Sequence, residues 1–208
     1  AMGVNDIIDT LSDSDTDMDA VLRDFGNKNP TEDPVLHFYE HFLSEYDSLL
    51  RKGRGVYYTP QPVVSFIVRS VHEALKRDYG LELGLADMAT WQEVSQRIKS
   101  IQIPAGVNPN EQFVKILDPA AGTGTFLETA IDVIKEELDN KWQSEGKSSE
   151  EITSLWRRYV PKFLLPRLCG FELMMAPYSI AHMKIGIKLF ETGYSSFEQD
   201  NQSVRLYL

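Results

Sequence analysis

The stretch that most constrains the fold is an apolar run that ends in a turn of small residues and two glycines. The run from Val114 to Leu117 is short and partly β-branched, which is typical of a buried parallel strand. Asp118 ends this run, and Gly122 and Gly124 follow it closely. Apolar residues then recur at helical spacing: Phe126, Leu127, Ala130, Ile131 and Ile134. The order strand, glycine turn and helix predicts the ligand-binding corner of a doubly wound α/β sheet, where backbone amides can serve a polar ligand.

Two helices with apolar faces are predicted on either side of this corner. Thr59 is suited to cap a helix that Pro60 begins, and this helix is expected to run to about Tyr79 and to end at Gly80. Pro177 is suited to begin another that runs to about Glu191. We expect the first helix to bury Val63, Val64, Ile67, Val71 and Leu75, and the second to bury Ile180, Met183, Ile187 and either Leu189 or Phe190.

Two further segments have the pattern of strands. Residues 168–173 form a short apolar run in which an acid, Glu172, comes near the end. Residues 203–208 alternate between polar and apolar side chains. With the strand before Asp118, they predict an α/β sheet of about three strands, and a helical segment over residues 140–166 separates the first two.

The chain ahead of this sheet has a different pattern. We expect a helical spacer or arm over residues 1–53 and a second domain over residues 54–208. Residues 31–50 carry a wide apolar stripe, and this helix contains His37 and His41 in an H-x-x-E-H arrangement. That spacing puts two imidazoles on one helical face, as a zinc site requires. Nothing downstream marks a third ligand, so we interpret them as polar residues of an aromatic helix and predict no metal site.

Composition limits the partners and the compartment. The 208-residue chain has a formal net charge of −10, so it is poorly suited to grip a phosphate backbone by itself. The compact basic cluster is Arg51-Lys52-Gly53-Arg54. One cysteine, Cys169, excludes an internal disulfide and favours a reducing compartment, and no apolar run is long enough for a membrane span, so we expect a cytoplasmic protein. Ala1-Met2-Gly3 is typical of a cloning remnant, so we expect a piece of a longer protein.

Three classes of ligand use a glycine corner of this kind. A nucleotide P-loop requires a lysine after the glycines, and none is present. A dinucleotide site requires a third glycine where this chain has Leu127. S-adenosylmethionine instead needs one acid for its ammonium group and another for its ribose hydroxyls. Asp118 and Glu172 stand after the first and second predicted strands, although Glu172 also has the simpler interpretation of a carboxylate that caps a loop.

Three motifs in order resemble one known family, the N6-adenine DNA methyltransferases of restriction–modification systems. The run from Asp118 to Leu127, D-P-A-A-G-T-G-T-F-L, is similar to the family's motif I. The run Tyr57-Tyr58-Thr59-Pro60 resembles its motif X, although simple packing of the tyrosines is an alternative, and Gly170-Phe171-Glu172 resembles its motif II. The resemblance implies a truncated Rossmann-like S-adenosylmethionine-dependent methyltransferase sheet, preceded by an α-helical region.

The resemblance also implies a cofactor site. In that family, motif X closes over the methionine end, the motif I acid and backbone hold the amino-acid end, and the motif II acid holds the ribose. An adenine flipped out of the duplex would then attack the methyl carbon. Carried to this chain, the implied cofactor-binding residues are Tyr58, Thr59, Pro60, Asp118, Ala120, Ala121, Gly122, Thr123, Gly124, Phe126, Glu172 and Leu173.

One departure from the family pattern affects catalysis. The family's catalytic motif is [DNS]-P-P-[YFW], and none of the ten prolines here is followed by another. We therefore predict no catalytic residue in this chain and no methyl transfer by the chain alone. Double-stranded DNA would be bound by another part of the protein, nuclease or helicase modules would belong to the same polypeptide, and an open sheet would favour a dimer. The alternatives are a modification subunit of a multisubunit system, a non-catalytic interaction module with a vestigial cofactor fold, and a methyltransferase for a small molecule or a protein.

Overall fold

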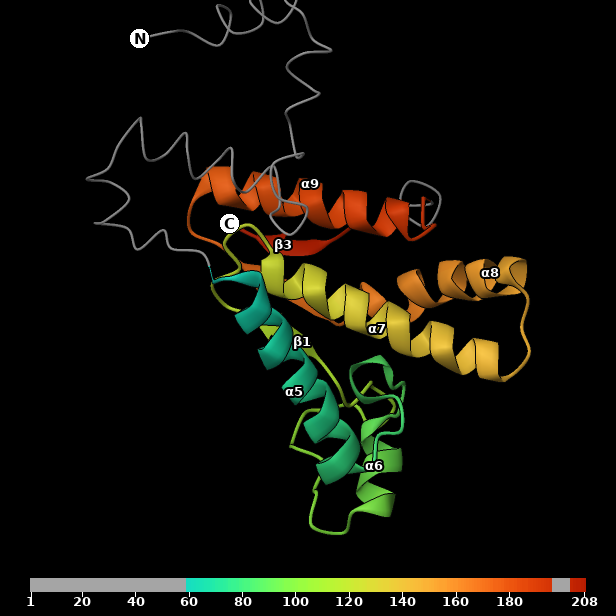
Figure 1. The fold of residues 1–208 in the computed structure, drawn as a ribbon. Helices are drawn as coiled ribbons and strands as arrows, with labels where there is room; N and C mark the ends of the chain where they lie inside the picture. The colour runs from blue at the N-terminus through green and yellow to red at the C-terminus, as the bar shows by residue number, and fades with distance from the viewer. Residues whose placement is uncertain (1–58, 196–202) are drawn as a thin grey trace, which may run out of the picture. The chain divides into compact units, whose positions relative to one another are not determined.

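The computed structural model describes residues 59–195 and 203–208 (Figure 1). The elements are, in order, α5 (Gln61–Tyr79), a 3-10 turn η1 (Gly84–Ala86), α6 (Trp91–Arg97), β1 (Ile116–Asp118), α7 (Thr125–Ser144), α8 (Ser149–Tyr159), a π-helical turn η2 (Val160–Leu164), β2 (Leu168–Phe171), α9 (Met175–Glu191) and β3 (Arg205–Tyr207). The predictions for residues 1–58, including the spacer, the histidine pair and Tyr58, lie outside the described residues.

The described strands form a parallel sheet in the order β1-β2-β3. Leu117 lies beside Cys169, and Cys169 lies beside Arg205. Because every strand runs the same way, the carboxyl ends of β1 and β2 lie at one edge of the sheet, as they must in a doubly wound fold. The expected α/β class with about three strands is confirmed.

One face of this sheet packs against helices. Gly170 of β2 shows how close the packing is, because a Cβ there would lie 2.9 Å from Leu127 of α7 and 2.6 Å from Leu206 of β3. On the opposite face, Leu117, Phe171 and Tyr207 are 59%, 46% and 48% exposed among the described residues. The described part therefore has one helix layer and one open sheet face.

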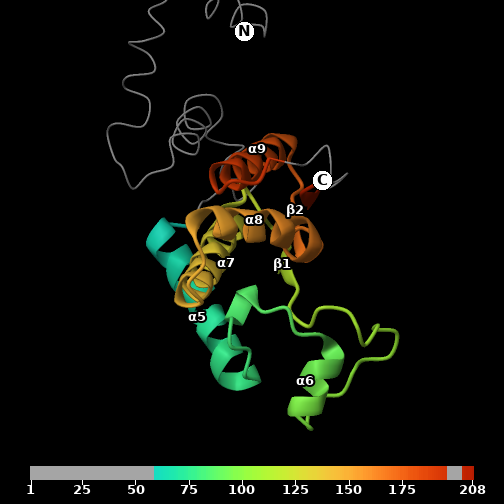
Figure 2. The same cartoon turned by 90° about the vertical axis from the view of Figure 1, so that its right-hand side faces the viewer.

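Helix α7 is the central helix of that layer. It lies between α9 and α5 in both ribbon views (Figure 1 and Figure 2). Its contact with α9 includes an ion pair between Glu128 and Lys184, whose charged atoms are 3.0 Å apart. Its contact with α5 includes Glu137, which accepts from His72 (3.2 Å) and from Lys76 (2.9 Å). Because α7 begins directly after the glycine turn, these contacts fix the direction in which the turn leaves the sheet.

The start and end of α5 follow from local chemistry, with one correction. Gly80 ends the helix with φ at 59°, in the left-handed region that favours glycine, as the sequence predicts. The expectation that Thr59 is the capping residue is wrong. Pro60 occupies the cap position, and its side chain has no acceptor that could cap the helix. Its carbonyl receives the N–H groups of Val63 and Val64.

The buried face of α5 is shifted by one position along the sequence from the expected face. Val64, Val68 and His72 are buried, whereas Val63, Ile67 and Val71 are between 41% and 47% exposed. The reason is that α5 is apolar over a wide arc, and α7 takes only part of that arc.

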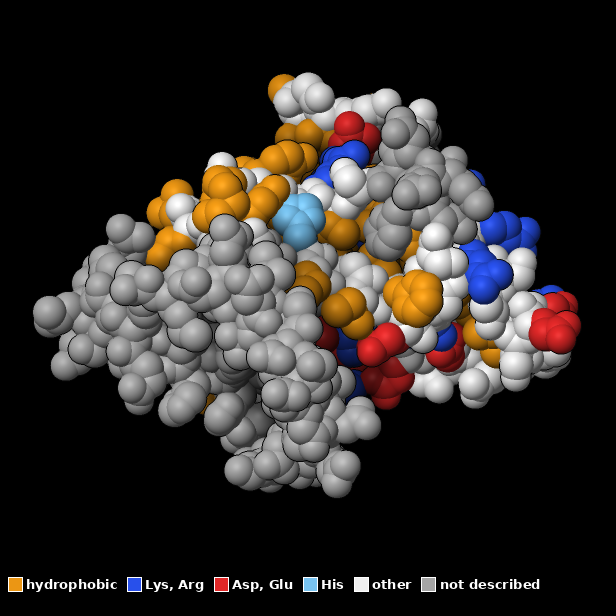
Figure 3. Space-filling model, turned by 90° about the horizontal axis from the view of Figure 1, so that it is seen from above, with side chains coloured by type: hydrophobic (Ala, Val, Ile, Leu, Met, Phe, Trp, Pro, Cys, Tyr) orange, Lys and Arg blue, Asp and Glu red, His pale blue; other side chains and the backbone are white. Residues whose placement is uncertain are grey.

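The predicted buried face of α9 is also wrong. The buried residues are Pro177, Ala181, Lys184, Ile185 and Leu189. Of the expected residues, Leu189 is buried, whereas its alternative Phe190 is 68% exposed and Met183 and Ile187 are 45% and 47% exposed. Figure 3 looks at the side of the molecule where α9 lies and shows hydrophobic side chains gathered on that surface. This helix is apolar on both faces, so periodicity alone cannot select the buried one, and Lys184 is buried because it pairs with Glu128.

Candidate functional site

The glycine turn lies between β1 and α7. Gly122 and Gly124 have φ angles of 55° and 81°, a conformation that side chains other than glycine rarely adopt. The N–H of Gly124 donates to the carbonyl of Ala121 at 2.7 Å, which closes the turn. A Cβ on Gly124 would also lie 3.1 Å from the side chain of Ala181 in α9. Backbone conformation therefore favours glycine at both positions, and close packing against α9 adds to this at Gly124.

Asp118 ends β1 with its carboxyl group partly buried. One oxygen, Oδ1, accepts the N–H of Ala120 at 3.1 Å. The other, Oδ2, is buried and has no hydrogen-bond partner among the described residues. Burial raises the pKa of Asp118, the bond from Ala120 opposes that rise, and the negative charge of Glu172 adds to it. A cationic donor beside Oδ2 would remove the cost of leaving that oxygen without a partner.

Glu172 follows β2 and faces the same turn. Its Oε2 accepts the N–H of Gly122 at 2.9 Å. Its Oε1 accepts the N–H groups of Leu173 and Met174 at 2.8 and 2.9 Å. Its own N–H donates to the carbonyl of Tyr207 in β3 at 2.9 Å. The structure thus brings together the two acids that the sequence selected, at the carboxyl ends of neighbouring strands.

The other predicted site residues lie around this turn in different environments. Ala121 and Thr123 are buried, and the N–H of Ala121 donates to the carbonyl of Phe171. Ala120 is exposed, and Phe126 is partly buried. Leu173 is 96% exposed, directly after Glu172.

The start of α5 lies close to the start of α7. Thr59 and Pro60 are both exposed. The next residue, Gln61, donates from its side-chain amide to the hydroxyl of Thr129, one turn into α7, at 3.1 Å. This contact supports the expected placement of residues 59 and 60 near the glycine turn.

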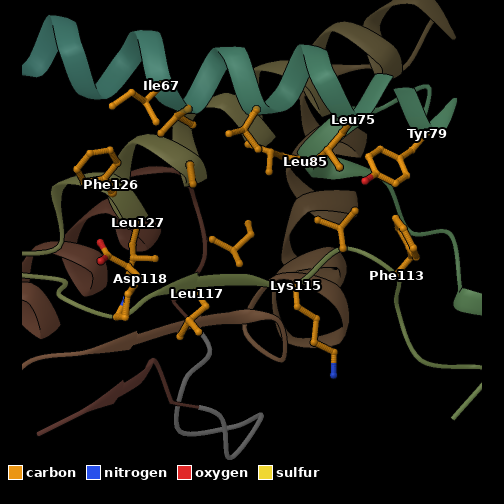
Figure 4. A pocket seen from close by; sticks show the side chains of 16 residues that line it. Ile67, Leu75, Tyr79, Leu85, Phe113, Lys115, Leu117, Asp118, Phe126 and Leu127 are labelled. Carbon is orange, nitrogen blue, oxygen red and sulfur yellow. The ribbon is translucent and has the colours of Figure 1, made fainter. Parts of the chain in front are cut away.

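An apolar groove of about 520 Å³ reaches the site at one end. Figure 4 shows α5 along one side and the strand segment from Phe113 to Asp118 along the other. Asp118 and Phe126 lie at one end of the groove, and Tyr79 and Phe113 lie at the other. Glu172 does not line it. Only the Asp118 end of the groove belongs to the candidate site.

Sequence reasoning missed the residues that hold the site together. The bond between Glu172 and Gly122 joins positions 50 residues apart, and no local pattern marks it. The same is true of Gln61 with Thr129 and of Lys184 with Glu128. Each of these pairs depends on how elements far apart in the sequence pack together, and local sequence patterns do not show that.

Within residues 59–195 and 203–208, no cluster of three or more histidine, cysteine or acidic residues is arranged to hold a metal ion. Over the same residues, no helix is both long and apolar enough to cross a membrane.

Comparison with known proteins agrees with the geometry of this corner. A model of the N-6 DNA methylase family matches residues 31–187, which is most of the chain. The chain belongs to the N-6 DNA methylase family. The match begins ahead of the glycine corner and ends within α9, so both acids of the site lie inside it.

One solved structure of a larger enzyme is similar to this N-6 DNA methylase chain. It is that of a nuclease-deletion mutant of the Type ISP restriction-modification enzyme LlaGI in complex with a DNA substrate mimic. The identity is 27% and the TM-score 0.43, over 74% of this chain and 9% of that chain. This chain therefore spans less than a tenth of the length of that enzyme. No curated protein sequence matches the chain.

Proposed function

We propose that this chain is the S-adenosylmethionine-binding portion of a DNA adenine-N6 methyltransferase within a restriction–modification enzyme. The observation that carries the proposal is the pair Asp118 and Glu172, placed on either side of a glycine turn at the ends of adjacent parallel strands. Membership in the N-6 DNA methylase family supports it, since enzymes that methylate adenine N6 generally use S-adenosylmethionine.

The residues present fit this cofactor. The buried oxygen Oδ2 of Asp118, which lacks a partner among the described residues, suits a charged ammonium group. The turn of Gly122 and Gly124 lets a ligand approach the backbone, and the amides at the start of α7 suit a carboxylate. In this proposal Glu172 accepts the ribose hydroxyls, and Leu173, which is exposed, contacts the face of the adenine ring. When bound, the cofactor supplies the methyl group for transfer to the adenine nitrogen.

The proposed partners follow from the same assignment. Double-stranded DNA would be bound by another part of the longer protein, because this chain carries a net charge of −10. Nuclease or helicase modules in the same polypeptide, and a cytoplasmic location in a prokaryote, belong to the proposal as well. Residues 1–53 would be a spacer and residues 54–208 part of the methyltransferase domain. The open sheet face would also favour a dimer, which light scattering at high protein concentration would detect as a doubled mass.

Calorimetric titration of the 208-residue chain with S-adenosylmethionine and with its demethylated product tests the cofactor assignment. We expect one site per chain, and an affinity lower by about tenfold or more in Asp118→Ala and in Glu172→Ala, because each loses a hydrogen bond to a charged group. Lys147→Ala is the matched control, since Lys147 lies beyond the far end of α7.

The same titration separates the proposal from its alternative. A non-catalytic interaction module with a vestigial fold would bind neither ligand. Binding that is equal in the wild type and in both acid variants would contradict the assigned site, even if the cofactor binds elsewhere on the chain.

A further inference from the structure

We infer that Glu172 is a positioning residue for the glycine turn, in addition to its proposed contact with the ribose. The role at the turn rests on contacts within this chain. The effect of ligand, described below, rests on the proposed function.

The carboxylate of Glu172 joins two separate pieces of backbone. One is the turn, reached through the N–H of Gly122 at 2.9 Å. The other is the segment that leaves β2, reached through the N–H groups of Leu173 and Met174 at 2.8 and 2.9 Å. No other side chain among the described residues joins these two pieces in this way.

The turn has few other attachments to the sheet. Among the described residues, the N–H of Ala121 donates to the carbonyl of Phe171 at 2.8 Å, and the N–H of Gly124 bonds only within the turn. Gly122 is held at a positive φ that glycine can leave readily. The bond to Glu172 is the one hydrogen bond that Gly122 makes to another segment within the described part of the chain, so we infer that it selects this conformation.

The count of lone pairs predicts what a ribose changes. Each carboxylate oxygen accepts about two hydrogen bonds. From the described residues, the Oε1 atom already accepts two, from Leu173 and Met174, whereas Oε2 accepts one, from Gly122. A ribose that gives one hydroxyl to each oxygen must therefore replace one of the two amides on Oε1, while Gly122 keeps its bond. Glu172 can then hold the turn and the ribose at the same time.

Hydrogen exchange of single amides, followed by NMR on the 208-residue chain, tests this role. In Glu172→Gln the side chain retains one oxygen, for which Gly122 competes against two N–H groups. We expect the Gly122 amide to exchange about tenfold faster or more without ligand, as loss of a hydrogen bond to a charged acceptor predicts. Glu172→Ala, which removes every acceptor, must show at least the same increase.

Two internal references separate positioning from general loss of stability. The amide of Ile116 in β1 donates to the carbonyl of Arg167 and reports on the sheet, so its exchange must stay unchanged in both variants. Asp118→Asn retains an oxygen for Ala120, and it should weaken ligand binding without exposing Gly122.

The ligand arm uses S-adenosylhomocysteine. We expect protection of Gly122 to persist and protection of either Leu173 or Met174 to fall when it binds. If Gly122 exchanges at the wild-type rate in both Glu172 variants, the positioning role is refuted, whatever happens to affinity. If the wild type binds no S-adenosylhomocysteine, the proposed function fails, while the ligand-free comparison still decides the positioning role.

Discussion

At Asp118, the two oxygens of one carboxyl group have different surroundings. One accepts a backbone N–H and the other is buried without a partner among the described residues. Burial is the first cause of the raised pKa of this group. A raised pKa in the folded state means that the ionised form destabilises the fold, so this cost is present above the raised pKa and disappears as the pH falls.

The variant Asp118→Asn should therefore be more stable and bind less well. Asparagine keeps the acceptor for Ala120 and removes the buried charge, so we expect the Tm at pH 7 to rise by about 2–4 °C. The affinity for S-adenosylmethionine should fall, because a neutral amide is a poor partner for an ammonium group. Thermal unfolding and titration of the same sample measure both effects. A lower Tm would show that the carboxylate stabilises the fold, contrary to this account.

The residues of the candidate site also show which single positions can be predicted from the sequence. Asp118, Gly122, Gly124 and Glu172 were all predicted, because each stands at a fixed place after a strand or in a tight turn. The need for glycine at position 170 was not predicted, since it comes from Leu127 and Leu206, which crowd it from other elements. Sequence patterns mark positions where the backbone requires a particular conformation. They do not mark positions where neighbouring side chains leave no room for a Cβ.

At the scale of the element, the limits of periodicity are clearest in α5 and α9. Both helices were predicted with nearly correct ends, from Gly80 in one case and from the proline-led start in the other. Their buried faces were not, because each is apolar over a wide arc. The choice of face depends on polar contacts that cross between helices, such as Glu137 with His72 and Glu128 with Lys184.

The contact of α5 with α7 predicts a pH-dependent stability. The buried His72 accepts the N–H of Leu85 at Nδ1 (3.3 Å) and donates from Nε2 to Glu137, so the neutral ring fits the site. Burial, followed by the charge of Lys76, lowers the pKa of His72 from its usual 6.5, and Glu137 and Glu73 oppose that shift. Below about pH 6.5 His72 takes up a proton in the unfolded chain more readily than in the folded chain. The stability of the fold therefore decreases as the pH is lowered, until the pKa of His72 in the folded state is passed.

Denaturant unfolding at a series of pH values measures this slope. We expect the free energy of unfolding to decrease from about pH 6.5 downwards in the wild type. In His72→Gln, which cannot take up a proton, the decrease should be smaller even if the variant is less stable at every pH. Equal slopes in the two proteins would show that His72 is not the group responsible.

At the scale of the whole molecule, the described sheet has one layer of helices and one open face. Leu117, Phe171 and Tyr207 are exposed on that face, with Phe171 and Tyr207 in ring contact at 5.4 Å. Parallel sheets are normally covered on both faces. Within the described residues, the corner that we propose for the cofactor is built from the ends of β1 and β2 and the turn, and a second layer does not contribute to it.

Because the proposed cofactor corner is built only from β1, β2 and the turn, we predict that cofactor binding and methyl transfer are separate properties of this chain. The proposed cofactor residues lie on β1, β2 and the turn, whereas the family's acceptor motif requires a Pro-Pro pair that the sequence does not contain. With labelled S-adenosylmethionine and double-stranded DNA, we expect incorporation at the level of a no-protein blank. The titration described above should still detect binding under the same conditions. Incorporation above the blank that disappears in Asp118→Ala would show that this chain carries an acceptor site of its own, and would overturn the division of roles proposed for it.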